Sequence, residues 1–233
     1  MPALDRASSV PDDLSPVPLQ TPGLSGRVAL ALVMDVSASA YESGPSQMWT
    51  YDVETDTWAA IRVANPLAAG PSSDRRVLAY DASVDRLIAF ADQIRRGPWL
   101  FDRRTGRWAT SAAAAPEIGF GWWPTGGEIA YDEATERIVV FSGGRMVAYD
   151  AAADSWEVLW SGDDPAHPEG LRTVRFYHTM VYDPVNQRLV VYGGEHPTSD
   201  PMVWVQSDDV IAFDPATRQW SVPLEASTVQ PVK

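Results

Sequence analysis

Short runs of apolar residues, separated by clusters of Asp, Gly, Pro, Asn and Ser, recur along most of the chain. The runs hold four to six residues and are rich in Val, Ile, Tyr and Phe, as in Ile138–Phe141 and Leu189–Tyr192. They lack the apolar spacing of about three to four residues that marks an amphipathic helix. Runs of this length and composition between turn-forming clusters are typical of β-strands. We therefore expect an all-β fold.

Two interleaved motifs give this pattern a period. An aromatic residue followed by Asp recurs four times, and a Trp lies seven positions after each aromatic residue. The four pairs are Tyr51 with Trp58, Phe101 with Trp108, Tyr149 with Trp156 and Phe213 with Trp220. A Tyr-Asp motif recurs three times at 51-residue intervals, and an Arg follows six positions after each Tyr. These pairs are Tyr80 with Arg86, Tyr131 with Arg137 and Tyr182 with Arg188. We interpret the recurring Arg as structural, and the Asp as the opening residue of a turn whose carboxylate accepts from a backbone N–H two residues on.

Each repeat predicts a meander of four antiparallel strands. In the fourth repeat we expect strands at Thr179–Tyr182, Arg188–Tyr192 and Val210–Phe213, and a last strand that starts near Trp220. The repeats are expected at 27–62, 76–110, 127–161 and 177–224, within a domain of residues 26–225. The first repeat lacks a recognisable inner strand, so we predict fifteen strands. Residues 1–25 are expected to form a flexible Pro/Ser-rich leader, and 226–233 a tail.

Two glycine pairs add a family resemblance. Gly143-Gly144 and Gly193-Gly194, each followed by an aromatic residue and then by a Trp seven positions further on, resemble the kelch repeat over roughly residues 27–224. The resemblance implies a kelch-type β-propeller of about four blades, the first incomplete. The pattern departs from the kelch repeat in the second unit, where Ala91-Asp92 replaces the glycine pair, and in the first, where no pair is found. Kelch-like copper oxidases acting on galactose use a Tyr crosslinked to a Cys; this polypeptide has no Cys, which excludes that chemistry for it.

The predicted number of blades does not decide whether the ring is closed. Kelch-like rings usually hold more than four blades, and an open arc leaves apolar surface and strand edges uncovered. Three explanations fit: truncation of a longer gene product, which we favour, a compact four-blade ring, or self-association of two arcs through their open blade edges.

Composition and net charge limit the kinds of partner and the cellular compartments that we expect. The chain has 18 Lys and Arg against 31 Asp and Glu, a formal charge of −13, which argues against nucleic acid as a partner. The absence of Cys excludes disulfides and thiolate metal sites. The longest apolar run, Val28–Met34, is too short to span a membrane. No signal peptide is recognised, so the sequence as it stands suggests a cytoplasmic protein, and a truncated N-terminus would suggest an exported or periplasmic one.

The long connections between strands are expected to gather at one end of the blades, where binding sites usually lie. The candidate ligand-binding residues in them are Phe120, Trp122, Trp123, Trp204, Arg172, Arg175 and His178. The four aromatic residues could form a platform for a sugar ring, or could cover the channel end and pack on a neighbouring blade. Arg172 and Arg175 precede His178, and could meet an anionic ligand at the channel mouth or pair with acidic neighbours.

Metal and catalytic motifs are weak. Two groups carry metal-capable side chains: Glu195, His196 and Asp200 with His178, and Asp163, Asp164, His167 and Glu169. Neither has the spacing of a recognised ligand motif, so we expect no metal and no cofactor. The chain has no nucleophile elbow, phosphate-binding loop or zinc-helix motif. We therefore favour a non-catalytic binding module for a protein or glycan over a carbohydrate-active enzyme that uses acidic or metal-binding loop residues; a structural fragment of a larger exported protein is the third hypothesis.

Overall fold

The computed structural model describes residues 28–33, 47–52, 55–61, 63–64, 76–91, 98–116, 128–162, 174–197 and 203–224. Every regular element in these ranges is a β-strand. Within them, no helix is long and apolar enough to cross a membrane. The expected leader, 1–25, and tail, 226–233, lie outside the described residues.

Fifteen of the described strands form four antiparallel sheets, which we call blades 1 to 4. Blade 1 has three strands, β1 (Val28–Val33), β2 (Gln47–Asp52) and β3 (Thr57–Ile61). Blade 2 consists of β4 (Arg76–Asp81), β5 (Arg86–Ala91), β6 (Trp99–Asp102) and β7 (Arg107–Thr110). Blade 3 consists of β8 (Glu128–Asp132), β9 (Arg137–Ser142), β10 (Arg145–Asp150) and β11 (Ser155–Ser161). Blade 4 consists of β12 (Thr179–Asp183), β13 (Arg188–Tyr192), β16 (Val210–Asp214) and β17 (Gln219–Leu224).

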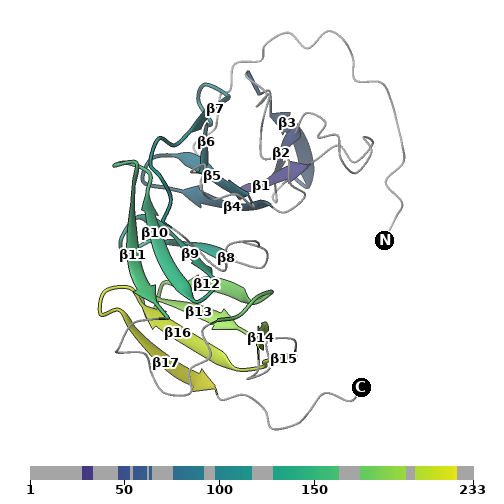
Figure 1. Ribbon diagram of the computed structural model, residues 1–233. Coiled ribbons are helices and arrows are strands. Elements are labelled where there is room, and N and C mark those ends of the chain that lie inside the picture. Colours follow the sequence, from purple (N-terminus) through teal and green to yellow (C-terminus); the bar gives the residue numbers. More distant parts are fainter. Residues whose placement is uncertain are drawn as a thin grey trace.

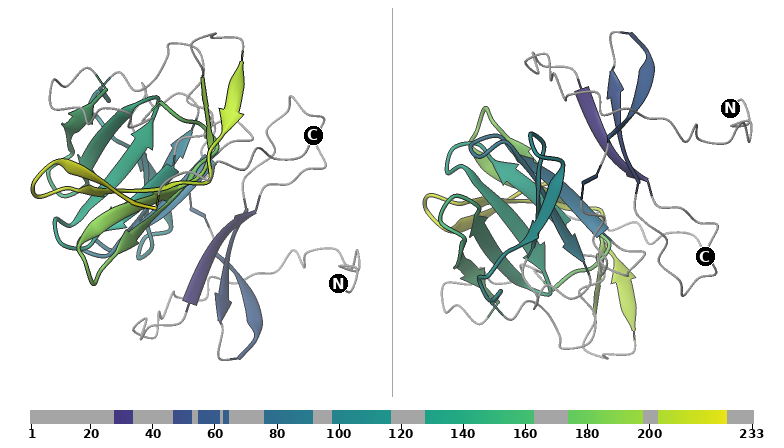
Figure 2. Two further views of the ribbon diagram at one scale, coloured as in Figure 1. Left: turned by 90° about the horizontal axis from the view of Figure 1, so that it is seen from below. Right: turned by 90° about the horizontal axis from the view of Figure 1, so that it is seen from above.

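The blades follow one another around an open arc (Figure 1). The first strands of blades 2, 3 and 4 are neighbours, because β8 contacts both β4 and β12. Blades 1 and 4 form the two ends of the arc and do not meet (Figure 1). Both further views show blade 1 apart from the other three blades (Figure 2). The chain therefore has an all-β, propeller-like fold with an incomplete first blade, as the sequence predicted. The described blades form an open arc, which decides a point that the sequence left undecided.

The short turns at one end of the blades share a backbone geometry. The Asp that ends a strand accepts a hydrogen bond from the backbone N–H two residues on, at 3.0 Å for Asp81 with Ser83 and for Asp132 with Ala134. Two residues further along, just before the next strand, φ is positive, at 51° for Asp85 and 53° for Glu136. The loops between the paired residues Asp81 and Arg86, and Asp132 and Arg137, hold four residues each, a length usually built around a type I turn. The predicted role of the repeated Asp is confirmed.

Side chains alternate between the two sides of a strand, so blades 2, 3 and 4 each have two apolar faces. The forward face of a blade packs on the blade that follows it, and consists of Ala79, Ile88, Phe90 and Leu100 in blade 2, and of Ala130, Val139, Phe141, Met146 and Ala148 in blade 3. The rear face carries the repeated aromatic residue and its Trp. The ring of Trp156 lies 5.8 Å from that of Phe90, and the ring of Trp220 lies 5.4 Å from that of Phe141. The repeated Trp therefore seals each of these two blade-to-blade interfaces.

One part of blade 4 differs from the prediction. Between β13 and β16, where the sequence predicted only a loop, β14 (Glu195–Pro197) and β15 (Trp204–Gln206) form a two-stranded hairpin. Two backbone hydrogen bonds of 2.8 Å between Phe176 and Glu195 tie the hairpin to the segment before β12. Strands of three residues are too short to show a recognisable alternation, which is why the sequence analysis missed them.

Candidate functional site

Three of the seven candidate ligand-binding residues lie in the described part of the chain, and all three lie at the loop end of blade 4. Arg175 and His178 precede β12, and Trp204 begins β15. The other four, Phe120, Trp122, Trp123 and Arg172, lie outside the described residues. So do five residues of the metal hypotheses, Asp163, Asp164, His167, Glu169 and Asp200. Among the described residues, no group of three or more His, Asp or Glu side chains could hold a metal ion.

Arg175 is the structural anchor of this end of the blade. Its guanidinium donates to both carboxylate oxygens of Asp209, at 2.8 and 3.1 Å, and to the carbonyl oxygen of Gly193 at 2.9 Å. The Ser207 hydroxyl donates to the same carboxylate at 2.7 Å. These bonds join the segment before β12 to the end of β13 and the start of β16. Of the two roles considered for Arg175, an anionic ligand or acidic neighbours, these contacts fit the second.

The electrostatics of this pair follow from its burial. Burial alone would raise the pKa of Asp209, but the hydrogen bonds from Arg175 and Ser207, together with the charge of Arg175, outweigh it and hold the pKa below its ordinary value. The Arg175 side chain is completely buried, and a fork of donors facing two carboxylate oxygens is the geometry that compensates an arginine for lost hydration. At neutral pH the Asp209 carboxyl is therefore ionised.

His178 lies beside this pair and is also buried. Its ring packs on that of Phe141, with the centroids 4.8 Å apart. Neither ring nitrogen has a hydrogen-bond partner of good geometry among the described residues. Burial, assisted by the positive charge of Arg175, lowers the pKa of His178 to about 4. At neutral pH His178 is therefore an uncharged ring that packs between blades 3 and 4.

The backbone around His178 is tightly fitted. Gly194 has a φ of +97°, and a Cβ built there would lie 2.7 Å from the carbonyl oxygen of Phe176. Tyr177 itself has a φ of +56°, which is unusual for a bulky residue. Such conformations persist where the surrounding structure fixes them, and they concentrate at functional sites. The glycine pair of the repeat thus has a physical role at this position, because it admits the close approach of the chain before β12.

An aromatic pair joins the hairpin to the segment before β12. The rings of Phe176 and Trp204 meet edge to face, with centroids 5.3 Å apart. Trp204 is 45% exposed, and Val203 beside it is also exposed. Because the half-buried Phe176 supports one side of the indole, part of Trp204 stays open to solvent on a fixed base. We call Phe176 and Trp204 the aromatic pair.

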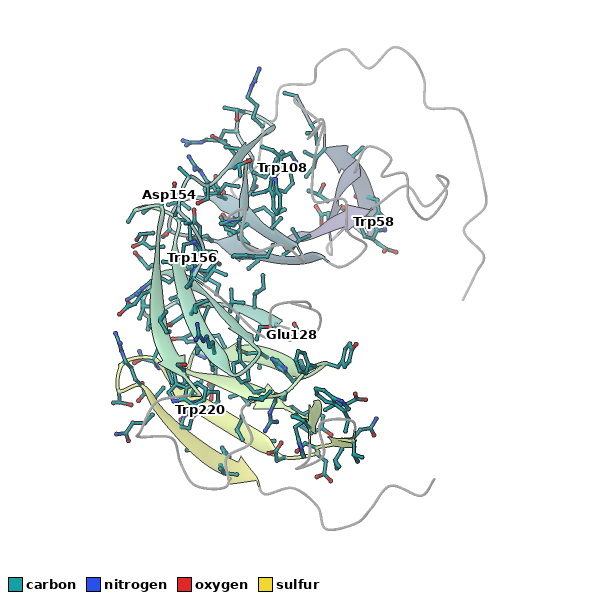
Figure 3. The ribbon with its side chains drawn as sticks, viewed as in Figure 1. Trp58, Trp108, Glu128, Asp154, Trp156 and Trp220 are labelled. Atoms are coloured by element: carbon teal, nitrogen blue, oxygen red, sulfur yellow. The ribbon has the colours of Figure 1, made fainter. Side chains whose placement is uncertain are left out.

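Glu128 is the carboxylic acid that most resembles a catalytic acid among the described residues. It begins β8 and lies on the inner side of the arc, opposite the outer positions of Trp156 and Trp220 (Figure 3). Burial raises its pKa. Glycoside hydrolysis needs two carboxyl groups across the scissile bond. The equivalent positions of the described first strands in blades 2 and 4 carry Val77 and Thr179, so neither strand places a second carboxylate at this position.

Phe176, Ser207 and Asp209 were not among the residues that the sequence pattern indicated. Asp209 stands outside both repeated motifs, and it lies 34 residues after Arg175. Their positions next to predicted strand ends indicate that they lie at the loop end of the blade. Those positions do not indicate that Asp209 contacts Arg175.

Comparisons with known proteins support the fold. No protein-family model matches the chain, and no curated protein matches its sequence. Among solved structures it is similar to YjhT, with a TM-score of 0.51 and 13% identity, over 79% of this chain and 60% of YjhT. It is also similar to an auxiliary nutrient binding protein from Bacteroides thetaiotaomicron, with a TM-score of 0.43 and 13% identity, over 87% of this chain and 42% of that protein. The second likeness is too weak to carry an argument. The chain thus shares a β-propeller-like fold with YjhT and spans about 60% of the length of that protein.

Proposed function

We propose that the chain is a kelch-type, non-catalytic binding module that takes a glycan ligand at the loop end of blade 4. The observation that carries the proposal is the aromatic pair. Trp204 offers an indole that is 45% exposed and supported by Phe176, which is a surface suited to the apolar face of a sugar ring. An exposed aromatic residue on a fixed base loses little conformational freedom when it binds.

The buried anchor supports the proposal by fixing the base. Arg175 bonds to Asp209 and Gly193, and so holds together the two ends of the connection that carries the hairpin. A binding residue is effective when the residues beneath it are locked by packing and hydrogen bonds. In this proposal Arg175 and His178 are positioning residues, and Trp204 contacts the ligand.

The kelch assignment rests on the repeat. The Asp-initiated turns, the glycine pairs of blades 3 and 4, and the Trp that seals each described interface recur at the positions that the family resemblance implies. The four candidate residues outside the described ranges, Phe120, Trp122, Trp123 and Arg172, remain predictions for the same end of the blades.

The test is a glycan panel titrated with the native protein and with the variant Trp204→Ala. We expect binding to weaken at least about tenfold in the variant, the loss typical of an aromatic anchor. Val185→Ala is the control, because Val185 is also an exposed apolar residue of blade 4, at 87%, but lies in the turn between β12 and β13 at the other end of the blade. Glycan binding that is unchanged by Trp204→Ala, or no glycan binding at all, would overturn the proposal. Capture of a protein through Trp204, with no glycan bound, would assign the site to a protein ligand.

A further inference from the structure

The forward face of blade 4 has the composition of a blade-to-blade interface. Counting from the Tyr-Asp motif of each repeat, its residues are Val181, Val190, Tyr192, Val210 and Ala212. The strand register confirms that they share one face, since Val190 pairs with Val181 on one side and Ala212 on the other, and Tyr192 pairs with Val210. The equivalent residues of blades 2 and 3 form the cores between blades.

Two residues of this face, Tyr192 and Val181, are exposed, whereas their equivalents in blades 2 and 3 are buried or partly buried. Tyr192 is 56% exposed, while Phe90 and Phe141 at the same repeat position are 1% and 0% exposed. Val181 is 55% exposed, while Ala130 is 8% exposed. A cluster of exposed apolar side chains on one face of a sheet marks an interaction surface. The series of interfaces that runs from blade 2 to blade 4 thus continues onto a surface with no further blade among the described residues.

The two internal interfaces show what covers such a face. In each, the Trp at the fixed position of the next rear face packs on the aromatic residue of the forward face, Trp156 on Phe90 and Trp220 on Phe141. Two more Trp residues of the chain occupy this position: Trp108, which packs in the cluster that also contains Ile61 and Val63, and Trp58. Trp58 pairs with Tyr51 in the same register in which Trp156 pairs with Tyr149, and it is 56% exposed.

We propose that two copies of this chain associate head to tail, the forward face of blade 4 in one copy packing on the rear face of blade 1 in the other. Figure 1 shows blades 1 and 4 at opposite ends of the arc, where they do not meet within one copy. Two copies joined at both ends would form a ring of eight blades, at the upper end of the range of about four to eight that propellers adopt. The contact is heterologous, so each copy contributes two different surfaces.

The test measures the oligomeric state of the full chain by sedimentation over a range of concentrations. We expect a dimer that dissociates on dilution. Both Tyr192→Glu and Trp58→Ala should weaken it at least about tenfold, because each removes an aromatic residue from the centre of the contact. Val185→Glu is the control, since Val185 is 87% exposed in the turn between β12 and β13, off the forward face. Far-UV circular dichroism checks that all variants remain folded.

A mixing experiment separates this arrangement from others. Tyr192→Glu protein keeps an intact rear face, and Trp58→Ala protein keeps an intact forward face, so an equimolar mixture should form mixed dimers through one native contact. A monomer at all concentrations would overturn the proposal, and so would a dimer insensitive to either substitution. A dimer lost in Tyr192→Glu but kept in Trp58→Ala would show a face-to-face contact instead. Because Trp204→Ala alters neither face, its effect on glycan binding is independent of this result.

Discussion

Removal of the Asp209 carboxylate is the sharpest test of the buried anchor. In Asp209→Ala the guanidinium of Arg175 loses the carboxylate that now faces two of its nitrogens, while its side chain stays completely buried. Removal of one partner of a buried ion pair costs about 3 to 5 kcal/mol. The Asp209 side chain is 13% exposed, so water can reach the site in the variant. We therefore expect the free energy of unfolding to fall by about 3 kcal/mol, the lower end of that range. For a chain of this size that corresponds to a fall in Tm of about 6 to 12 °C.

The assay is thermal and urea unfolding of three variants. Glu157→Ala is the control, because Glu157 is 39% exposed and also pairs with two arginines, Arg137 and Arg218. An exposed pair contributes at most about 1 kcal/mol, so this variant should lose no more than about 4 °C. The double variant Arg175→Met/Asp209→Leu should be more stable than Asp209→Ala, since no buried charge is left without a partner.

Equal losses in Asp209→Ala and Glu157→Ala would refute the reasoning, because burial would then make no difference to the value of the pair. A double variant less stable than Asp209→Ala would refute it as well. In that case the packing of the Arg175 side chain, rather than its charge, would hold the segment in place.

Two further predictions concern the same end of blade 4. Burial lowers the pKa of His178 to about 4 from 6.5, so the stability contributed by the neutral ring is present above about pH 6.5 and is lost as the pH falls towards 4, by about 3 kcal/mol in all. Urea unfolding at several pH values should show this loss in the native protein and not in His178→Phe, and the same loss in both would contradict it. Gly194→Ala should destabilise the protein by at least about 2 kcal/mol, and more than Gly193→Ala, because its Cβ would lie 2.7 Å from a carbonyl oxygen rather than 3.2 Å. Thermal unfolding of the two variants compares them, and equal melting temperatures would count against the steric argument.

The repeat made most of the fold predictable. A fixed spacing from Tyr131 or Tyr149 marks the turn, the register and the side of the sheet on which a residue lies, because side chains alternate along a strand. The predicted strands Arg188–Tyr192 and Thr179–Tyr182 match β13 and β12 to within one residue. Local rules sufficed here because each blade strand pairs with the next blade strand in the sequence.

The candidate site was less predictable, because it depends on contacts between non-repeated segments. The bond between Arg175 and Asp209 joins two loops, and no sequence pattern distinguishes it from a contact with a ligand. The burial of His178 depends on Phe141 of the preceding blade. Trp204 could be identified as a loop aromatic residue from the sequence, but its support by Phe176 comes from a hairpin whose strands are too short to predict.

The meander topology has a consequence for synthesis on the ribosome. Each blade strand can pair as soon as the next one has emerged, so the backbone hydrogen bonds of a blade form early. The forward face of the blade stays uncovered until about 50 more residues have been made. Every blade thus passes through a stage with an apolar face open to solvent and to chaperones. Blade 4, with Tyr192 and Val181 exposed, retains the surface that blades 2 and 3 present only transiently.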